Sequence, residues 1–302
     1  MGTPDFAVAS LDTLYRSGCP IAGVVTAPDK PAGRGLPVSQ SAVKKYALEN
    51  NLKILQPEKL RAPQFLRELV ALKADLQVVV AFRMLPEVVW NMPPMGTINL
   101  HGSLLPQYRG AAPINWALIN GERVTGVTTF KLQHEIDTGN ILLQETIIIG
   151  DDETAGDLYN RMKEIGAVLI LKTVQELAEG KLKSIPQKLP DSDHQATLKS
   201  APKLTTETCK IDWSKNVDET YNLIRGLSPY PAAFTVLNNK TLKIFKAEKE
   251  IVHHTVSPGE FETDKKTFLK FACKDGWVSV SALQLEGKKK MSTAEFLRGY
   301  HF

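Results

Sequence analysis

The sequence predicts an α/β protein, with a doubly wound, mostly parallel domain followed by a smaller domain of short strands. Apolar strands alternate with amphipathic helices through the first half of the chain, as in doubly wound sheets. After residue 230, short strands alternate with turn residues, which fits a small barrel. A chain of 302 residues also has room for two domains with separate cores.

The first half shows a regular order of strands and helices. Continuous apolar runs predict buried strands, and apolar residues three or four apart predict helices. The expected strands are 21–27, 76–82, 97–101, 124–136 and 141–149, and the expected helices are 41–52, 63–73, 113–120 and 154–180. Neither a Gly-x-Gly-x-x-Gly sequence after a strand nor a P-loop sequence occurs, which disfavours dinucleotide and P-loop nucleotide binding.

The start of the chain has an unusual pattern. Residues 1–6 read as the turn that follows a first strand, and residues 6–16 as the helix after that turn, yet no strand precedes them. A sheet without a central strand would leave unpaired edges on both neighbouring strands. We therefore expect an apolar strand immediately upstream, lost through a start codon placed too late or through truncation. An in-frame apolar segment before Met1 would confirm this.

The second half is predicted to begin after a linker. Residues 183–203 are rich in Pro, Ser, Asp and Lys, as linkers are, so we expect domains at 1–182 and 204–302. Within the second domain the expected elements are strands at 208–213, 233–237, 242–247, 268–273 and 277–285, a hairpin turn at 238–239, and helices at 217–227 and 293–298.

Composition restricts the class of protein. The hydrophobic content of 43% and charged content of 23% are those of a soluble globular protein, and no apolar run is long enough for a bilayer. The three cysteines form no Cys-x-x-Cys pair and indicate reduced thiols in the cytoplasm. His253 and His254 are better explained as a solvated turn than as ligands, so we predict no metal.

The net charge of +4 is unevenly distributed. From residue 183 onward there are 19 Lys and Arg against 14 Asp and Glu, whereas the first 182 residues hold 18 against 19. This surplus is a modest indication of a polyanionic partner for the second half.

The stretch from Gly96 to Gly139 carries the strongest chemical signal. Asn99 and His101 lie two apart on a predicted strand, so their side chains leave the same face, about 6.6 Å apart along the strand. The strand ends at Gly102, before a glycine-rich loop, where open parallel sheets place ligands. Such a pair alone is more often a hydrogen-bonded structural pair, so this spacing by itself leaves both interpretations open.

The combination of motifs is more specific than the pair. Asn-x-His-x-Ser-Leu-Leu-Pro at 99–106, Tyr-Arg-Gly-Ala-Ala-Pro-Ile at 108–114 and Asp-Thr-Gly at 137–139 together resemble the folate-dependent formyltransferases. The start of the chain, Pro-Ala-Gly-Arg-Gly at 31–35 and Ile-Asp-Trp at 211–213 extend the resemblance over nearly the whole chain. It implies a Rossmann-like catalytic domain and an OB-like β-barrel.

The resemblance also implies an activity. With the flanking sequence included, it points to transfer of the formyl group of 10-formyltetrahydrofolate to the amino group of initiator methionyl-tRNA, for translation initiation. The expected protein is a cytoplasmic monomer that binds folate and tRNA and no membrane. Alternatives are a formyltransferase for a sugar amine or glycinamide ribonucleotide, a formyl-folate hydrolase, and an RNA-binding protein with an inactive catalytic domain.

Formyl transfer passes through a tetrahedral oxyanion, and donors aimed at that oxygen stabilise it most. Asn99 and His101 suit this role, and a carboxylate would keep the imidazole cationic. The resemblance implies Asn99, His101 and Asp137 as the catalytic set, with Asp137 also the general base. An Asp-Thr-Gly sequence is otherwise a common turn former.

The remaining expectations concern the two substrates. Phe82, Met84 and Leu85 follow a buried strand and are a plausible pterin wall, although Met84 and Leu85 equally suit an ordinary core. Ser103, Leu104, Leu105 and Pro106 match the folate loop of the family. The resemblance assigns Arg34 to tRNA phosphate or end contact, and the basic run Lys288, Lys289 and Lys290 suits sequence-independent tRNA backbone contact. The alternative for all four cations is a solvated surface.

Overall fold

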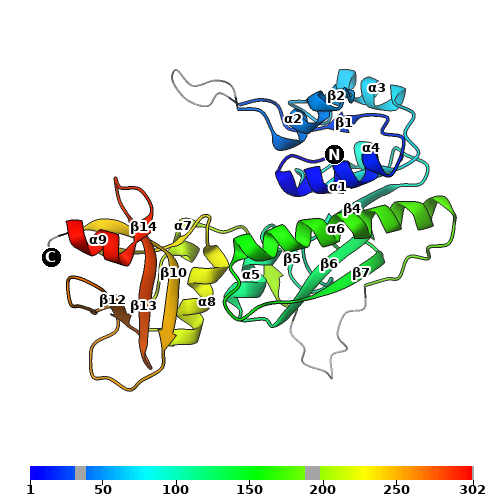
Figure 1. The fold of residues 1–302 in the computed structure, drawn as a ribbon. Helices are drawn as coiled ribbons and strands as arrows, with labels where there is room; N and C mark the ends of the chain where they lie inside the picture. Colours follow the sequence, from blue (N-terminus) through cyan, green and yellow to red (C-terminus); the bar gives the residue numbers. More distant parts are fainter. Residues whose placement is uncertain (31–38, 188–197, 301–302) are drawn as a thin grey trace. The chain divides into compact units, whose positions relative to one another are not determined.

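The computed structural model describes residues 1–30, 39–187 and 198–300, and the chain divides into two compact units (Figure 1). The first unit comprises residues 1–109, 126–147 and 159–199, and the second comprises 110–125, 148–158 and 200–302. Both units therefore take residues from the first half of the chain. None of the helices in the described ranges is long and apolar enough to cross a membrane.

The first unit holds most of the predicted strand–helix alternation. Its elements, of which the last three also enter the second unit, are α1 (Asp5–Arg16), β1 (Val24–Val25), α2 (Ala42–Glu49), β2 (Ile54–Leu55), α3 (Pro63–Ala71), β3 (Gln77–Val80), α4 (Glu87–Trp90), β4 (Thr97–His101), β6 (Val124–Lys131), β7 (Ile141–Ile148) and α6 (Ala155–Ala178).

The strands of this unit form two sheets rather than one. β1 and β2 pair in parallel, and a second sheet has the order β3-β4-β6-β7. β3 and β4 are parallel, whereas β4 and β6 are antiparallel, so the sheet is mixed. Figure 1 shows α6 running along β6, and the hydroxyls of Thr129 and Thr173 meet between these elements at 2.9 Å. This is an α/β layer arrangement.

Residues Met1 and Gly2 lie between the two sheets. The Gly2 amide donates to the Val25 carbonyl of β1 (3.0 Å), and the Val80 amide of β3 donates to the Met1 carbonyl (2.9 Å). Beyond these residues, a cavity of about 800 Å³ separates the facing edges of β1 and β3. Met1 and Gly2 therefore bridge the edges of the two sheets at this point.

The second unit is built around an antiparallel sheet. Its elements are α5 (Pro113–Ile119), α7 (Thr206–Cys209), α8 (Val217–Leu227), β9 (Ala233–Leu237), β10 (Lys240–Glu250), β11 (Phe261–Thr263), β12 (Leu269–Ala272), β13 (Trp277–Leu285), β14 (Met291–Ser292) and α9 (Thr293–Gly299). The short strands β5 (Arg109–Gly110) and β8 (Ser200–Ala201) form a separate pair.

The strand order of this sheet is β11-β12-β13-β10-β9, with β14 also paired to β13. A register shift in β10 between Ile244 and Ala247 marks a bulge, which bends a strand. The core includes Ile224 and Leu227 of α8 and Leu242 and Ile244 of β10. Among the described strands, the pairings end at β9 and β11, so they give a curved open sheet and do not establish the expected OB-like barrel.

Two element predictions were partly wrong for local reasons. Residues 208–213, expected as a strand, begin in helix α7, because the Thr205 hydroxyl caps the helix by accepting from the Thr208 amide (3.2 Å). Strand pairing in this range is found at Lys210, which forms a parallel bridge with Phe234. The strand expected at 124–136 ends at Lys131, whose amide donates to the Asn140 carbonyl (3.0 Å) at the base of a loop. The predicted helix 217–227 agrees with α8, which Asn216 and Glu219 cap reciprocally.

Candidate active site

Strand β4 carries the Asn-x-His pair at its carboxyl end. It lies between β3 and β6, with Asn99 opposite Val79 on one side and Phe130 on the other. His101 is the last residue of the strand and is 7% exposed, while Asn99 is half-buried. Since the two residues are two apart on one strand, their side chains leave the same face of the sheet.

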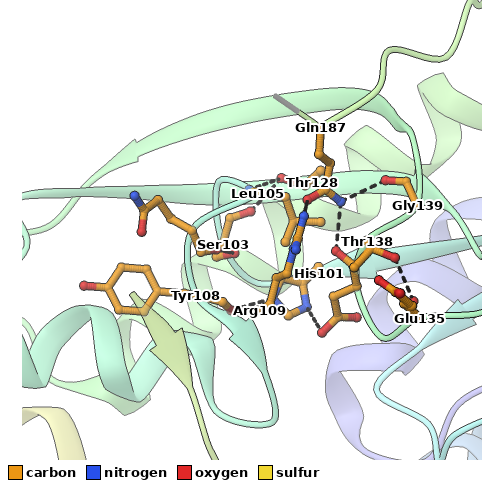
Figure 2. Close-up of polar contacts among 12 residues, drawn as sticks. His101, Ser103, Leu105, Tyr108, Arg109, Thr128, Glu135, Thr138, Gly139 and Gln187 are labelled. Atoms are coloured by element: carbon orange, nitrogen blue, oxygen red, sulfur yellow. Dashed lines mark hydrogen bonds and ion pairs between the residues drawn. The ribbon is translucent and has the colours of Figure 1, made fainter. Parts of the chain in front are cut away.

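The imidazole of His101 is held at both nitrogens (Figure 2). Nε2 lies 2.9 Å from the carbonyl oxygen of Tyr108, and Nδ1 lies 3.8 Å from Oδ2 of Asp137. A carbonyl oxygen only accepts, so Nε2 carries the proton in either charge state of the ring. Nδ1 is then the position that gains or loses a proton, and it faces a carboxylate.

The Tyr108 carbonyl is itself fixed by the backbone. Tyr108 has φ +58°, a left-handed conformation that is uncommon outside glycine, and its amide donates to the Lys199 carbonyl at 2.7 Å. Tyr108 belongs to a motif noted in the sequence, but the role of its main chain was not predicted. Every residue type has a main-chain carbonyl, so the sequence does not show which one accepts a hydrogen bond.

Asp137 lies in the loop between β6 and β7, and not at the end of a strand as predicted. Its φ is +54°, which Asp tolerates better than most residues. Gly139 allows the loop to close, since a Cβ there would lie 1.7 Å from the Lys131 carbonyl oxygen. The loop that follows β6, the strand paired with β4, thus places the Asp137 carboxylate beside His101.

Gln187 supports this loop from a position 50 residues further along the chain. Its Nε2 donates to the carbonyl oxygens of Asp137 and Gly139, both at 2.8 Å. Its Oε1 accepts from Nε of Arg109 at 3.1 Å and from Nη2 of the same guanidinium. Figure 2 shows Gln187 lying between Arg109 and Gly139. Sequence reasoning missed Gln187, which stands in the stretch interpreted as a linker.

The loop after β4 is organised by the hydroxyl of Thr128 on β6. This buried hydroxyl donates to the Ser103 carbonyl (2.6 Å) and accepts from the Leu105 amide (3.2 Å) and from Nε2 of Gln144 (2.9 Å). Gln144 also donates to the Leu105 carbonyl (3.0 Å). The loop is therefore tied to the sheet by a satisfied buried polar network.

The residues expected at the folate site differ in how far their side chains are exposed. Ser103 and Leu105 are buried, whereas Leu104 and Pro106 are half-buried. Leu85 is 8% exposed and packs in a hydrophobic cluster that half-buried Phe82 joins, while Met84 is 71% exposed. Of the suggested pterin wall, Met84 offers its side chain to solvent and Leu85 belongs to the core.

The residues expected at the tRNA site are only partly described. Arg34 lies outside the described residues. Lys288, Lys289 and Lys290 are exposed in the turn between β13 and β14, and the Lys290 ammonium lies 4.6 Å from the ring centre of Phe245. In the described ranges, three or more His, Cys, Asp or Glu side chains nowhere gather in a group that could hold a metal ion.

This arrangement has the parts that acyl transfer needs. A buried imidazole with a defined tautomer faces a carboxylate that is 14% exposed, and a carboxamide donor lies on the same strand. Such a set can donate hydrogen bonds to a developing oxyanion and accept a proton from an attacking amine.

Comparison with protein families identifies the chain's relatives. The family described as formyl transferase matches residues 1–174, and the formyl transferase C-terminal domain matches residues 203–301. A protein of Bacteroides fragilis named methionyl-tRNA formyltransferase is 53% identical over 306 residues, covering 100% of this chain and 94% of that protein. A protein of Flavobacterium johnsoniae with the same name is 50% identical, covering 100% and 95%.

Solved structures share the fold at lower identity. The sugar 3N-formyl transferase WlaRD, solved in the presence of dTDP and 5-N-formyl-THF, has a TM-score of 0.66 at 23% identity, covering 95% of this chain and 97% of that one. HypX from Aquifex aeolicus, in complex with tetrahydrofolic acid, has a TM-score of 0.59 at 22% identity over 83% of this chain and 43% of that one. These similarities concern the fold alone.

Proposed function

The chain belongs to the formyl transferase family, and we propose that it transfers the formyl group of 10-formyltetrahydrofolate to the amino group of methionine on initiator methionyl-tRNA. One observation carries the choice of acceptor: the chain is about half identical, from end to end, to proteins named methionyl-tRNA formyltransferase. The sugar formyltransferase that shares the fold has 23% identity, so a sugar amine is the weaker candidate.

The reaction forms one C–N bond and breaks another. The methionyl amine attacks the formyl carbon, giving a tetrahedral intermediate with a negative oxygen. The bond between the formyl carbon and N10 of the folate then breaks, the carbonyl re-forms, and the proton lost by the amine is balanced by one gained at N10. The protein must therefore stabilise an oxyanion and move one proton.

Asn99 and His101 are the proposed oxyanion donors. Because Nε2–H of His101 is already donated to the Tyr108 carbonyl, the hydrogen bond to the formyl oxygen comes from Nδ1–H of the cationic ring. Asp137, whose carboxylate lies 3.8 Å from Nδ1, serves as general base for the attacking amine.

Some of the residues assigned to the folate site are proposed to contact the folate, and the buried ones are proposed to hold these residues in place. Met84, with its exposed side chain, and half-buried Phe82 contact the pterin, while Leu85 supports them from the core. In the loop after β4, Leu104 and Pro106 contact the folate, and buried Ser103 and Leu105 act by holding its backbone.

The tRNA contacts are proposed for Arg34 and for the exposed run Lys288, Lys289 and Lys290. Contacts of lysine with phosphate depend on salt and not on base sequence. Since the acceptor is a substrate of translation initiation, we propose that the protein works in the cytoplasm. That it is a monomer stays a prediction.

A direct assay tests this function. Purified protein is incubated with 10-formyltetrahydrofolate carrying a labelled formyl group and with initiator methionyl-tRNA. We expect acid-stable label on methionine after the ester bond to tRNA is hydrolysed, and none when the methionyl amine is acetylated beforehand. Label released only as formate, at the same rate with and without the tRNA, would identify a hydrolase.

A further inference from the structure

The carboxamide of Gln187 uses its full hydrogen-bonding capacity within the first unit. Its Nε2 carries two N–H groups and donates to the carbonyl oxygens of Asp137 and Gly139, both at 2.8 Å. Its Oε1 accepts from Nε and Nη2 of the Arg109 guanidinium. A guanidinium only donates and a carbonyl oxygen only accepts, so these partners leave a single orientation for the amide (Figure 2). An ionised carboxylate in its place would have no N–H for the two carbonyls.

The main chain next to Gln187 is attached to the start of β7. The amides of Ile141 and Ile185 each donate to the carbonyl of the other residue, both at 2.8 Å. This antiparallel bridge joins the first residue of β7 to the chain two residues before Gln187. Because the segment is held against the sheet by these bonds, the Gln187 side chain can hold its partners in place rather than move with them.

The loop between β6 and β7 needs such support around Asp137. The four residues before Asp137, 133–136, are exposed, so packing against a core does not fix this part of the loop. The two hydrogen bonds from Gln187 reach the main chain on either side of Thr138. The position of the Asp137 carboxylate therefore depends on Gln187.

The contacts of Gln187 also close a ring around His101. The Tyr108 carbonyl lies 2.9 Å from Nε2 of His101, and the side chain of the next residue, Arg109, donates to Gln187. Gln187 in turn holds the main chain of Asp137, whose carboxylate lies 3.8 Å from Nδ1 of His101. The imidazole and the carboxylate are therefore held, relative to each other, by residues 108, 109 and 187.

We propose that Gln187 is a positioning residue for formyl transfer: it holds the Asp137 carboxylate where that group acts as general base, and the Arg109 guanidinium orients Gln187. Reacting groups must be held to within about 0.5 Å of their productive positions, and a displacement of about 1 Å can cost about 10² in rate. The proposal rests on the proposed function, because it assigns a support to the base of that reaction. It does not depend on which amine accepts the formyl group.

A double-mutant cycle tests whether Gln187 acts through Asp137. Gln187→Met removes the amide and keeps a side chain of similar length, and it is made in the unaltered protein and in Asp137→Asn. In the unaltered protein we expect kcat to fall about 10- to 100-fold, with KM for folate and for tRNA changed less than about twofold. In Asp137→Asn the same substitution should lower kcat less than about twofold. Equal losses of kcat in both backgrounds would overturn the proposal.

Two further variants separate the two ends of the amide. Gln187→Glu still accepts from Arg109 but cannot donate to the loop carbonyls, so it should lose at least as much kcat as Gln187→Met. A kcat near that of the unaltered protein in Gln187→Glu would show that only the contact with Arg109 matters, and would overturn the proposal. The matched control Gln64→Met removes an exposed amide that donates to Glu68 (2.9 Å), and should leave kcat and Tm unchanged. If Gln187→Met does not fold, Gln187→Glu takes its place in the cycle.

A spectroscopic measurement keeps this inference separate from the proposed function. If the unaltered protein transfers no formyl group to any acceptor, the proposed function fails, and the ¹⁵N chemical shift of Nδ1 of His101 still reports the position of Asp137. We expect this signal to move in Gln187→Met in the same direction as in Asp137→Asn, and to stay in place in Gln64→Met. An unmoved signal in Gln187→Met would overturn the proposal, whatever the activity.

Discussion

The Nε2 atom of His101 lies 2.9 Å from the carbonyl oxygen of Tyr108, so a backbone group sets the tautomer of the imidazole in the proposed site. The other ring nitrogen is left facing Asp137 at 3.8 Å. In the proposed mechanism the two nitrogens therefore differ: Nε2 fixes the ring, and Nδ1 donates the hydrogen bond to the formyl oxygen.

The first prediction concerns the carboxylate. Asp137→Asn keeps the shape of the side chain, and asparagine tolerates the residue's φ of +54°, so folding is preserved. Loss of the general base and of the charge facing Nδ1 should lower kcat by about 10² to 10⁴. Steady-state kinetics beside thermal unfolding check this, and a kcat near that of the unaltered protein at equal Tm would remove Asp137 from the mechanism.

The second prediction concerns the carboxamide. Asn99→Ala removes a donor from the strand that carries His101, and loss of one oxyanion donor costs about 10² to 10³ in kcat. The matched variant Asn99→Gln retains the amide but moves it by one methylene, and it should recover only part of the loss. An unchanged kcat in Asn99→Ala would indicate the structural pair that the sequence pattern also allowed.

The third prediction concerns the loop after β4. Thr128→Val leaves the Leu105 amide and the Gln144 amide without their shared acceptor, at a cost of about 1–3 kcal/mol of stability for each unsatisfied group. If the loop contacts folate, KM for 10-formyltetrahydrofolate should rise about tenfold while KM for tRNA stays constant. Thr128→Ser keeps the hydroxyl and should restore the folate KM. Equal changes in both KM values would show a general loss of structure.

The fourth prediction concerns the basic turn between β13 and β14. Replacing Lys288, Lys289 and Lys290 by Gln should raise KM for tRNA and reduce its dependence on salt, by about 0.7–0.9 in log–log slope for each lost phosphate contact. The control replaces exposed Lys265 and Lys266 of the same unit by Gln. The same salt slope in both variants would show that the turn lysines are only solvated.

The fifth prediction concerns alkaline stability. Desolvation, aided by the hydrogen bond to Asp152 (2.8 Å), raises the pKa of Tyr221 from 10.0 to about 12. Between these values the unfolded chain loses the phenolic proton and the folded chain keeps it, so the free energy of unfolding falls by up to about 1.4 kcal/mol per pH unit. Urea unfolding from pH 9 to 12 should show a smaller fall in Tyr221→Phe. Parallel curves would contradict the assignment.

Much of the fold could be predicted from local patterns. Helix 217–227 and strands 233–237 and 277–285 agree with α8, β9 and β13, because caps, turns and alternation act within a few residues. The strand expected at 208–213 was wrong at residues 208 and 209, which lie in α7 because the Thr205 hydroxyl caps that helix.

Less of the candidate site could be predicted from the sequence, because the groups that position His101 and Asp137 come from distant parts of the chain. Asn99 and His101 share a strand, and their proximity follows from spacing alone. The distance from His101 to Asp137 depends on where a loop closes, and that loop depends on Gln187, 50 residues later. The hydrogen bond between His101 and the Tyr108 carbonyl uses a main-chain group, which any residue type would supply, so the sequence does not indicate it.

A competition measurement tests the central claim most directly. Equal concentrations of initiator methionyl-tRNA and a nucleotide-linked amino sugar are offered together with labelled 10-formyltetrahydrofolate, and the label on methionine, sugar and free formate is followed over time. We expect the label on methionine, with formation slowed by at least 10² in Asp137→Asn. Label on the sugar or in formate, with none on methionine, would contradict the account.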